Sequence, residues 1–323
     1  MLAIQATRAG GPEVLEAVDL PTPTPGPGEI LIRQEAVGLN YIDTYQRTGL
    51  YPVPFPTVLG LEGAGTVEAV GEGVTRFAVG DRAAYGNGPL GAYAEYHVVP
   101  AGRAVKAPSA IDSRTAAAAM LKGMTAEFLL RRCYPVRKGD AVLIHAAAGG
   151  VGSILTQWAR ALGATVIGTA GSPEKAALAR NFGADETILY REEDVAARVR
   201  AITGGAGVRV VYDGVGAATF EGSLASLGRR GMLVSYGNAS GPAPAVEPLR
   251  LSRGGSLFLT RPTLFDYVVT TEELDESAGA LFEVINSGAV KIDIGQTFPL
   301  SQTRQAHEAL EGRETTGSTL LIP

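Results

Sequence analysis

The sequence predicts an α/β protein in which a doubly wound parallel sheet is inserted into a β-rich domain. Three observations predict this arrangement. The first third carries short alternating strand patterns, strand and helix patterns then alternate through the middle, and the tail returns to a mixed pattern. We therefore predict a discontinuous β-rich domain at 1–122 and 264–323, with an α/β domain inserted at 123–263.

The composition is that of a globular protein long enough for two domains. The chain has 323 residues, of which 46% are hydrophobic and 19% are charged, and this length exceeds what one ordinary core supports. The net charge of −5 argues against binding to a nucleic-acid backbone, which needs clustered Lys and Arg. Cys133, the single cysteine, can form no internal disulfide. Because the sequence also shows no signal-peptide or membrane-span pattern, we expect a cytoplasmic protein.

The β-rich character of the first third comes from alternating and valine-rich segments. Residues 29–40 and 92–100 alternate apolar and polar side chains, and residues 63–85 form short strands broken by Gly and Asp. Residues 21–29 hold too many prolines for a helix or a ladder, so they are expected to form a surface connection.

The middle of the chain alternates strands and helices after a helical stretch at 113–132. Residues 172–182 show the clearest helix limits, with Ser172 as N-cap, Pro173 in the first turn and Gly183 beyond the end. Strands are expected at 141–147, 165–170, 186–190, 208–215, 231–238 and 256–262, and further helices at 149–162 and 192–203. The tail adds a helix that starts at 272 and ends near Gly288, a second helix at 301–313 and a closing strand at 317–323.

A glycine-rich turn lies between the strand at 141–147 and the helix that follows it. The segment reads "AAAGGVGS" and contains Gly149, Gly150, Val151 and Gly152. Glycines allow close backbone approach, and the start of the helix presents free N–H groups and a positive dipole end to a pyrophosphate. The turn is therefore predicted to bind a dinucleotide, the alternative being a tight turn without a ligand.

The end of the second strand of this unit indicates which dinucleotide binds. An NAD site places Asp or Glu there for the ribose hydroxyls, whereas this chain has Ala170, Gly171 and Ser172. Ser172 and Lys175 supply a hydroxyl and a cation for a 2′-phosphate, which favours NADPH over NADH. Glu174 complicates this interpretation unless it points to solvent, and the alternative for Lys175 is an ordinary solvated lysine.

With these segments in view, the whole chain resembles the zinc-independent NADPH:quinone oxidoreductases. They are the zeta-crystallin-like branch of the medium-chain dehydrogenase/reductase superfamily. The segments that carry the resemblance are "GPEVLEAVDLPTPTPGPGEILIRQEAVGLNYIDTYQRTGLYP", "GLEGAGTVEAVGEGVTRFAVGDRAAY", "AAAGGVGSILTQWARALGA", "REEDVAARVRAITGGAGVRVVYDGVG", "RRGMLVSYGNASG", "GSLFLTRPTL" and "GSTLLIP". The resemblance implies a Rossmann domain inserted in a GroES-like catalytic domain.

The departures from the zinc alcohol dehydrogenases agree with that branch. Those enzymes carry Cys where this chain has Asn40, and Gly-His-Glu where it has Gly60, Leu61 and Glu62. A catalytic zinc needs about three protein ligands, and the three histidines of this chain show no ligand spacing. We expect no metal site. A metal-free site still suits an acceptor that is already electrophilic, such as a quinone or a conjugated enone.

The resemblance also implies site residues. Asn40, Asp43, Tyr45 and Tyr51 map onto the wall of the nicotinamide and substrate site, with packing as the alternative for the tyrosines and helix capping for Asp43. Further cofactor contacts are implied for Asn40, Thr125, Tyr190, Ser235, Asn238 and Arg313. Cys133 is interpreted as structural.

Three functions follow as hypotheses. The leading one is NADPH-dependent quinone reduction, and the second is reduction of α,β-unsaturated ketones or aldehydes in the same pocket. The third is a structural or RNA-binding role, which the acidic charge disfavours. The resemblance implies a homodimer, in which residues 254–262 could pair edge to edge with their copy.

Overall fold

The computed structural model describes all 323 residues and divides into two compact units. Unit 1 comprises Met1–Met124, Tyr267–Asn286 and Ile292–Pro323, and unit 2 comprises Thr125–Asp266 and Ser287–Lys291. An α/β unit is thus inserted into a β-rich one, which is the class of fold that the sequence predicts. The predicted domain limits at 122/123 and 263/264 stay a prediction.

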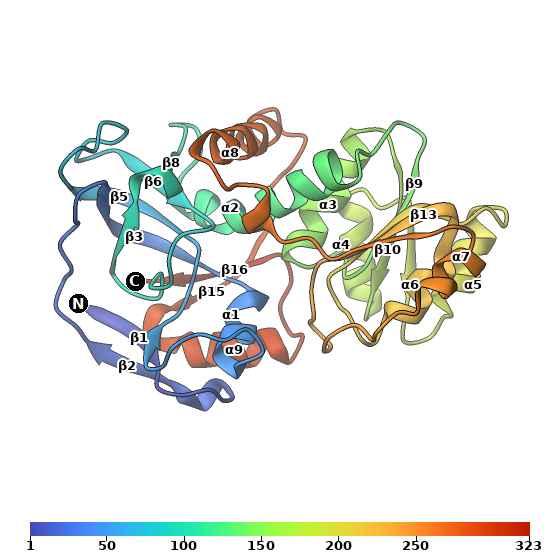
Figure 1. Cartoon of the computed structure of the whole chain (residues 1–323), viewed down its shortest axis with the longest axis horizontal. Helices are drawn as coiled ribbons and strands as arrows, with labels where there is room; N and C mark the ends of the chain where they lie inside the picture. The colour runs from blue at the N-terminus through green and yellow to red at the C-terminus, as the bar shows by residue number, and fades with distance from the viewer. The chain divides into compact units, whose positions relative to one another are not determined.

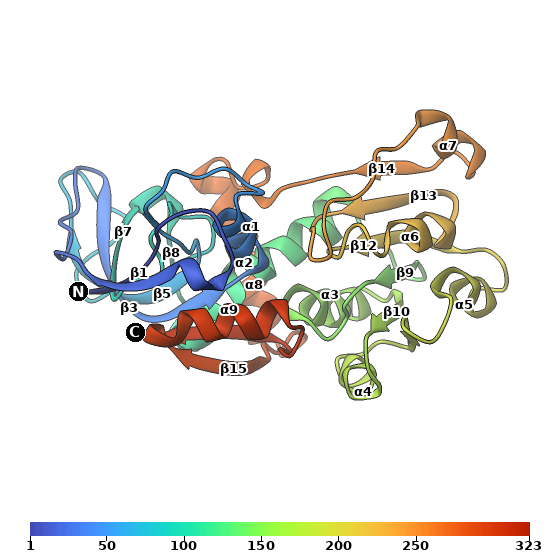
Figure 2. The ribbon, with the colours of Figure 1, turned by 90° about the horizontal axis from the view of Figure 1, so that it is seen from below.

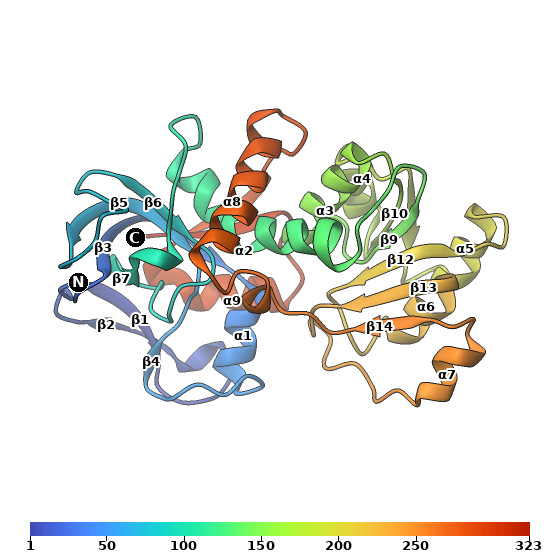
Figure 3. The ribbon, with the colours of Figure 1, turned by 45° about the horizontal axis from the view of Figure 1, so that its top comes forward.

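Unit 2 is built on a parallel sheet of six strands in the order β11-β10-β9-β12-β13-β14. In chain order the strands are β9 (Ala141–Ile144), β10 (Thr165–Ala170), β11 (Glu186–Leu189), β12 (Val208–Asp213), β13 (Leu227–Ser235) and β14 (Phe258–Thr260). Numbered from β9, this is the order 3-2-1-4-5-6 of a Rossmann sheet, which reverses beside its first strand. Figure 3 shows β9, β12, β13 and β14 running side by side.

The helices of unit 2 connect consecutive strands. They are α3 (Gly150–Ala161), α4 (Pro173–Asn181), α5 (Val195–Ile202), α6 (Phe220–Ser226) and α7 (Pro248–Arg253). Ser172 is the N-cap of α4 and Gly183 has a φ of 104° beyond its end, which confirms the predicted helix limits. Helix α7 was not expected, because it has only 6 residues and buries none of them, so its sequence shows no apolar stripe.

Unit 1 contains two mainly antiparallel sheets. The smaller has the order β2-β1-β4, and the larger has the order β15-β16-β3-β5-β6-β8, with β7 pairing to β3. The strands are β1 (Leu2–Ala6), β2 (Leu15–Asp19), β3 (Glu29–Leu39), β4 (Thr57–Val58), β5 (Gly63–Val70), β6 (Arg82–Tyr85), β7 (Tyr96–Pro100), β8 (Val105–Lys106), β15 (Ile294–Pro299) and β16 (Ser318–Ile322). Strand β15 was not predicted, because the polar Gln296 stands between Ile294 and Phe298 on the same face and interrupts the apolar alternation.

Four helices accompany these sheets. They are α1 (Tyr41–Thr48), α2 (Ser113–Phe128), α8 (Thr271–Asn286) and α9 (Thr303–Glu311). Helix α2 ends in a π-helical turn at Leu129–Cys133. Helices α1 and α9 lie next to each other although more than 250 residues separate them, and Tyr41 Oη donates to the Leu310 carbonyl at 3.0 Å (Figure 1). This pairing joins the start of the chain to its tail within unit 1.

Each unit has its own hydrophobic core. In unit 1 the core includes Ile30, Ile32, Leu59 and Tyr93, and in unit 2 it includes Leu143, Ile167 and Val211 from the central strands. Two separate cores account for a length that one core would not support.

Candidate functional site

The glycine turn of unit 2 delivers an uncapped helix start. Strand β9 ends at Ile144, and α3 begins at Gly150 with Gly149 as an N-cap that has no side chain to cap it. The first-turn N–H groups at 150–152 therefore have no intrahelical acceptor. Together with the positive end of the helix dipole, they are suited to bind the oxygens of a phosphate.

The turn closes so tightly that Gly152 cannot carry a side chain. A Cβ there would lie 2.1 Å from the Ala146 carbonyl oxygen, and one on Gly149 would lie 3.2 Å from the same atom. Ala146 itself has a φ of 50°, and its carbonyl accepts the Gly149 N–H at 2.9 Å. This close approach of backbone to backbone is the cradle that a pyrophosphate requires.

A buried chain of hydrogen bonds supports the turn from below. Ser223 Oγ donates to Asp213 Oδ2 at 2.7 Å, so His145 Nε2 donates to Ser223 at 2.9 Å. His145 Nδ1 then accepts from the Thr169 hydroxyl at 3.1 Å, and Thr169 Oγ1 accepts the Ala146 N–H at 3.3 Å. Burial lowers the pKa of His145 and so keeps its ring neutral. These hydrogen bonds require a neutral ring, because Nδ1 acts as an acceptor. The histidine that precedes the turn therefore positions it and is not available as a ligand.

The end of β10 carries no carboxylate, as the sequence indicates. Ser172 caps α4, and its Oγ accepts the Lys175 backbone N–H at 3.3 Å. The side chain of Glu174 is exposed but not isolated, because a hydrogen bond from the Ser172 hydroxyl is the largest cause that lowers the pKa of this carboxyl. In this structure the hydroxyl that was predicted to meet a 2′-phosphate is thus shared with Glu174.

Tyr190 lies beside the same turn. It follows β11, and its backbone N–H donates to the Ala170 carbonyl at 3.2 Å. A Cβ on Gly171 would meet the Tyr190 hydroxyl at 2.7 Å, so this glycine makes room for the phenol. Lys175 is half-buried at the start of α4. The structure therefore groups the residues predicted for the adenosine end of the cofactor.

Three further predicted contacts lie elsewhere in unit 2. Ser235 ends β13, is 3% exposed, and its Oγ has no hydrogen-bond partner. Asn238 is half-buried in the loop after β13, and Thr125 is buried on α2. The uncapped helix start, the close-packed glycine and the unpaired Ser235 hydroxyl are features that fit a bound dinucleotide.

In unit 1, Asn40 and Asp43 form the start of α1. Asp43 Oδ2 accepts the Asn40 backbone N–H at 2.8 Å, so the helix-capping alternative for Asp43 describes one of its contacts. The Asn40 side chain is directed into the protein, where Nδ2 donates to Glu62 Oε2 at 2.8 Å. These two predicted site residues thus lie at a helix start, which is the alternative that the sequence left open for Asp43.

Glu62 is the acceptor for a buried cation that sequence reasoning missed. Lys122 Nζ lies 2.8 Å from Glu62 Oε2, and the Leu121 N–H donates to Oε1 at 2.6 Å. Glu62 is 0% exposed and Lys122 is 5% exposed. Asn40 is a third donor to the Glu62 carboxylate. The buried negative charge is therefore balanced by a cation and by hydrogen bonds, as a buried charge requires.

Tyr45 and Tyr51 pack edge to face. Their ring centroids are 5.3 Å apart at 66°, and the Tyr51 N–H donates to the Tyr45 carbonyl at 3.0 Å. Tyr45 is buried and Tyr51 is half-buried. Arg313 is exposed just beyond α9, with a φ of 60°. Tyr45 is therefore packed within unit 1, while Tyr51 keeps accessible surface, and a site role for either tyrosine stays a prediction.

Asp43 also heads a second buried chain that the sequence did not reveal. Tyr93 Oη donates to Asp43 Oδ2 at 2.8 Å and lies 3.0 Å from His307 Nε2. Arg47 Nη1 lies 2.9 Å from His307 Nδ1 and pairs with Glu311. His307 and Glu311 lie one turn apart on one face of α9, and this spacing is the only local sequence signal of the hydrogen-bonded chain. Nothing in the sequence indicates that Tyr93 and Arg47 meet that face.

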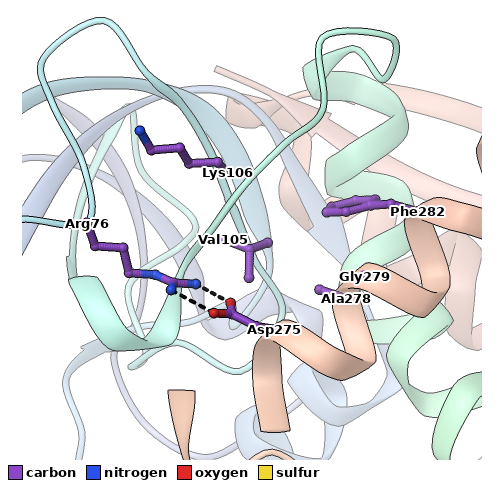
Figure 4. Close-up of a pocket in the computed structure, with 7 residues that line it drawn as sticks. All are labelled: Arg76, Val105, Lys106, Asp275, Ala278, Gly279 and Phe282. Carbon is purple, nitrogen blue, oxygen red and sulfur yellow. Dashed lines mark hydrogen bonds and ion pairs between the residues drawn. The ribbon is translucent and has the colours of Figure 1, made fainter. Parts of the chain in front are cut away.

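A shallow pocket lies elsewhere on unit 1 and holds none of the predicted site residues. It is lined by Arg76, Val105, Lys106, Asp275, Ala278, Gly279 and Phe282 (Figure 4). Both of its cations are paired, Arg76 with Asp275 and Lys106 with Asp81. Because its charges are neutralised at a solvent-exposed surface, we assign it no chemistry.

Two broader features complete the description. No group of three His, Cys, Asp or Glu side chains is placed to hold a metal ion. No helix combines the length and the apolar composition that crossing a bilayer demands.

Comparison with known proteins identifies the two parts of the chain. Residues 26–109 match the alcohol dehydrogenase GroES-like domain, and residues 150–283 match the zinc-binding dehydrogenase family. The quinone oxidoreductase of Pseudomonas aeruginosa is 54% identical over 99% of this chain and 99% of its own length. The 2-haloacrylate reductase of a Burkholderia species is 44% identical over 100% and 99%, respectively. The structure of Escherichia coli quinone oxidoreductase complexed with NADPH has a TM-score of 0.98 at 48% identity and covers 100% of both chains.

Proposed function

The chain belongs to the quinone oxidoreductase family of the medium-chain dehydrogenase/reductase superfamily, and from this premise we propose that it reduces quinones with NADPH. The observation that carries the proposal is the junction of β10 and α4, which has Ser172 and Lys175 and no carboxylate at the strand end. A carboxylate there would repel a 2′-phosphate. The relative of known structure was solved in complex with NADPH.

Residues of unit 2 are proposed to bind the cofactor. The backbone of Gly149, Gly150, Val151 and Gly152 holds the pyrophosphate, and Ser172 with Lys175 holds the 2′-phosphate. When bound, NADPH supplies a hydride. The other proposed cofactor contacts are Thr125, Tyr190, Ser235 and Asn238 of unit 2, together with Asn40 and Arg313 of unit 1.

Residues of unit 1 are proposed to form the acceptor site. Tyr51 offers a partly exposed aromatic face for a flat quinone, supported by its edge contact with Tyr45. Asn40 and Asp43 are proposed as the polar part of the same wall. Positions 40 and 61 hold Asn and Leu, which are not zinc ligands, so we propose that hydride reaches the quinone without a metal. A quinone is electrophilic enough for this, and the protein contributes orientation and exclusion of water.

Steady-state kinetics with two acceptors test the proposal. We expect kcat/KM with NADPH to be far higher for 1,4-benzoquinone than for a medium-chain conjugated enone. The relative named as a 2-haloacrylate reductase makes 2-chloroacrylate a useful third acceptor. An enone or 2-chloroacrylate that reacts orders of magnitude faster than the quinone would contradict the proposed substrate class. Tight NADPH binding without turnover of any acceptor would instead favour a structural role.

The assembly is proposed to be a homodimer formed through β14. This strand is the last of its sheet, and Figure 2 shows it beyond β13 at the outer edge. Phe258 on β14 is 55% exposed, which is unusual for a large aromatic side chain on a free strand edge. We expect sedimentation to give a dimer and Phe258→Asp to give a monomer, whereas a monomeric parent would contradict this. A cytoplasmic location, suggested by the single cysteine, is likewise a proposal.

A further inference from the structure

The two carboxyl oxygens of Asp43 have different surroundings. Oδ2 accepts two hydrogen bonds, from the Asn40 backbone N–H and from the Tyr93 hydroxyl, both at 2.8 Å. Oδ1 is buried and has no hydrogen-bond partner, although the whole residue is 0% exposed. A buried carboxylate oxygen without a donor is costly, while a carboxylic acid with its proton on that oxygen is much less so. When the carboxyl is protonated, the unequal surroundings therefore favour Oδ1 as the oxygen that carries the proton.

The hydrogen bonds that lead from Arg47 to Asp43 Oδ2 can have only one donor-to-acceptor direction. Arginine is always a donor, so Arg47 Nη1 donates to His307 Nδ1 across 2.9 Å. Burial and the Arg47 charge lower the pKa of His307 to about 3, so the ring is neutral and its only proton is on Nε2. Nε2 then donates to Tyr93 Oη across 3.0 Å, and Tyr93 must donate to Asp43. No member of this chain can accept a proton from Asp43.

The outer end of the chain is anchored by an ion pair. Arg47 is 1% exposed and its two Nη atoms reach the two carboxylate oxygens of Glu311 at 2.9 and 2.7 Å. Such a two-point pair fixes the guanidinium plane, and through it the orientation of His307. The chain thus keeps Oδ2 as an acceptor and leaves Oδ1 as the atom that can exchange a proton.

We propose that Asp43 holds, on Oδ1, the proton that the reaction consumes, and that Tyr93, His307 and Arg47 are positioning residues that reserve Oδ1 for this exchange. The inference rests on the proposed function, because quinone reduction needs a proton in addition to hydride. Hydride transfer adds two electrons and one hydrogen to the quinone and leaves a hydroquinone monoanion. The Asp43 O–H bond then breaks, the phenolic O–H bond forms, and the resulting carboxylate regains a proton from water.

The charges around Asp43 suit a group that releases and regains a proton at neutral pH. Burial raises its pKa to about 7, against the Tyr93 and Asn40 hydrogen bonds and the Lys122 charge, which lower it. Glu62 raises it further. The other charges facing this group are Arg47 and Glu311 at the far end of the chain. Without the Tyr93 bond the carboxyl would titrate at higher pH and would release its proton less readily.

The same unit contains a matched pair that lacks a carboxyl. Tyr85 Oη lies 3.0 Å from His97 Nδ1 and donates to Gln34 Oε1 at 2.5 Å. Burial lowers the pKa of His97 to about 4. Tyr85 is as buried as Tyr93, and His97 is buried like His307, but the Tyr85 hydroxyl donates to an amide. Tyr85→Phe is therefore the control for Tyr93→Phe.

The first test is a carboxyl titration of the full chain without cofactor. Protein labelled with ¹³C at aspartate carboxyl carbons is titrated by NMR, and the Asp43 signal is identified by its loss in Asp43→Asn. We expect this signal to titrate near pH 7, to shift upward in pH in Tyr93→Phe, and to be unchanged in Tyr85→Phe. An Asp43 signal that titrates near pH 4, or equal shifts in both tyrosine variants, would overturn the inference.

The second test is the pH profile of quinone reduction. Protonated Asp43 is the competent form, so kcat should be level below about pH 7 and fall as pH rises through the Asp43 pKa. Asp43→Asn should lower kcat roughly 10²-fold and abolish this pH dependence. His307→Gln keeps one hydrogen-bond acceptor and one donor, so it should retain the wild-type pH profile of kcat. His307→Leu removes both and should shift that profile. If Asp43 only caps the helix, Asp43→Asn will keep the wild-type profile, and the inference is wrong.

The two tests separate this inference from the proposed function. If no quinone is reduced but the Asp43 signal titrates near pH 7 and responds to Tyr93→Phe, the function fails and the positioning chain stands. If quinones are reduced with a pH profile that Asp43→Asn leaves unchanged, the proton-holding role fails and the function stands. Should Asp43→Asn not fold by circular dichroism, the Asp43 carboxyl signal is assigned through its own backbone resonances in the wild type, and the Tyr93→Phe and Tyr85→Phe titrations then decide the matter.

Discussion

Helices α3 and α4 of unit 2 both begin at the carboxyl end of a parallel strand, but their first turns differ. Helix α3 starts after Gly149, which offers no side chain, so its first N–H groups stay available. Helix α4 starts after Ser172, whose Oγ already accepts the Lys175 N–H. One helix start is left open for an external anion, and the other is closed by its own side chain.

This difference separates general binding from selectivity. The proposed pyrophosphate site on α3 uses backbone groups alone, so it would bind NADH as well as NADPH. The proposed 2′-phosphate site on α4 uses the side chains of Ser172 and Lys175, which matter only when that phosphate is present. Substitutions at α3 should therefore weaken both cofactors, and substitutions at α4 should change their ratio.

The largest effect is expected for Gly152→Ala. Its Cβ would lie 2.1 Å from the Ala146 carbonyl oxygen, a backbone atom that cannot move without opening the turn. We expect binding of both cofactors to be lost in fluorescence titrations, with a stability cost of roughly 1–3 kcal/mol. Gly279→Ala on α8 is the matched control, because a Cβ there meets nothing within 4 Å. Retained binding of either cofactor by Gly152→Ala would show that the turn is not the phosphate cradle.

A smaller and selective effect is expected at Ser172. Ser172→Asp keeps an N-cap acceptor but places a carboxylate where the 2′-phosphate is proposed to bind. We expect weaker NADPH binding, unchanged or stronger NADH binding, and a melting temperature close to that of the wild type. Ser172→Ala, which loses the cap, should cost about 1 kcal/mol of stability. Equal weakening of both cofactors by Ser172→Asp would remove the distinction between the two helix starts.

The smallest effect is expected for Glu174→Gln. The exposed carboxylate accepts a hydrogen bond from Ser172, so it competes with a 2′-phosphate for that hydroxyl and also repels it. Removing its charge should tighten NADPH binding a few-fold at low ionic strength and less at high salt. NADH binding should not change. Tighter NADH binding of the same size would mean that Glu174 acts on the cofactor as a whole.

The cofactor-binding part of the fold could be predicted from sequence because its signals are local. The strand, the glycine turn, Ser172 as N-cap and Gly183 beyond α4 are each readable within a short window. The structure confirms all four, except that the strand ends at Ile144, three residues before its predicted end. The Glu174 contact was missed, since a side-chain hydrogen bond on a first helical turn depends on rotamers that residue types do not specify.

The contacts of the candidate site residues in unit 1 could not be predicted in the same way. Asp43 meets Tyr93 from 50 residues away along the chain, and Tyr93 meets His307 from 214 residues away, so these pairings depend on how the sheets of unit 1 fold. The same holds for Lys122 and Glu62, whose buried pair has no signature in either local sequence. Family resemblance identified Asp43, but only coordinates reveal which of its oxygens is unpaired.

Cofactor selectivity during quinone turnover tests the central claim most directly. We propose measuring kcat/KM for NADPH and NADH with 1,4-benzoquinone in the wild type, in Lys175→Ala and in the control Arg180→Ala at the far end of α4. The account predicts a strong NADPH preference that Lys175→Ala reduces by about 1.5–3 kcal/mol, with NADH rates and the control unchanged. A wild-type enzyme that uses NADH equally well, or a Lys175→Ala variant that loses both cofactors alike, would contradict it.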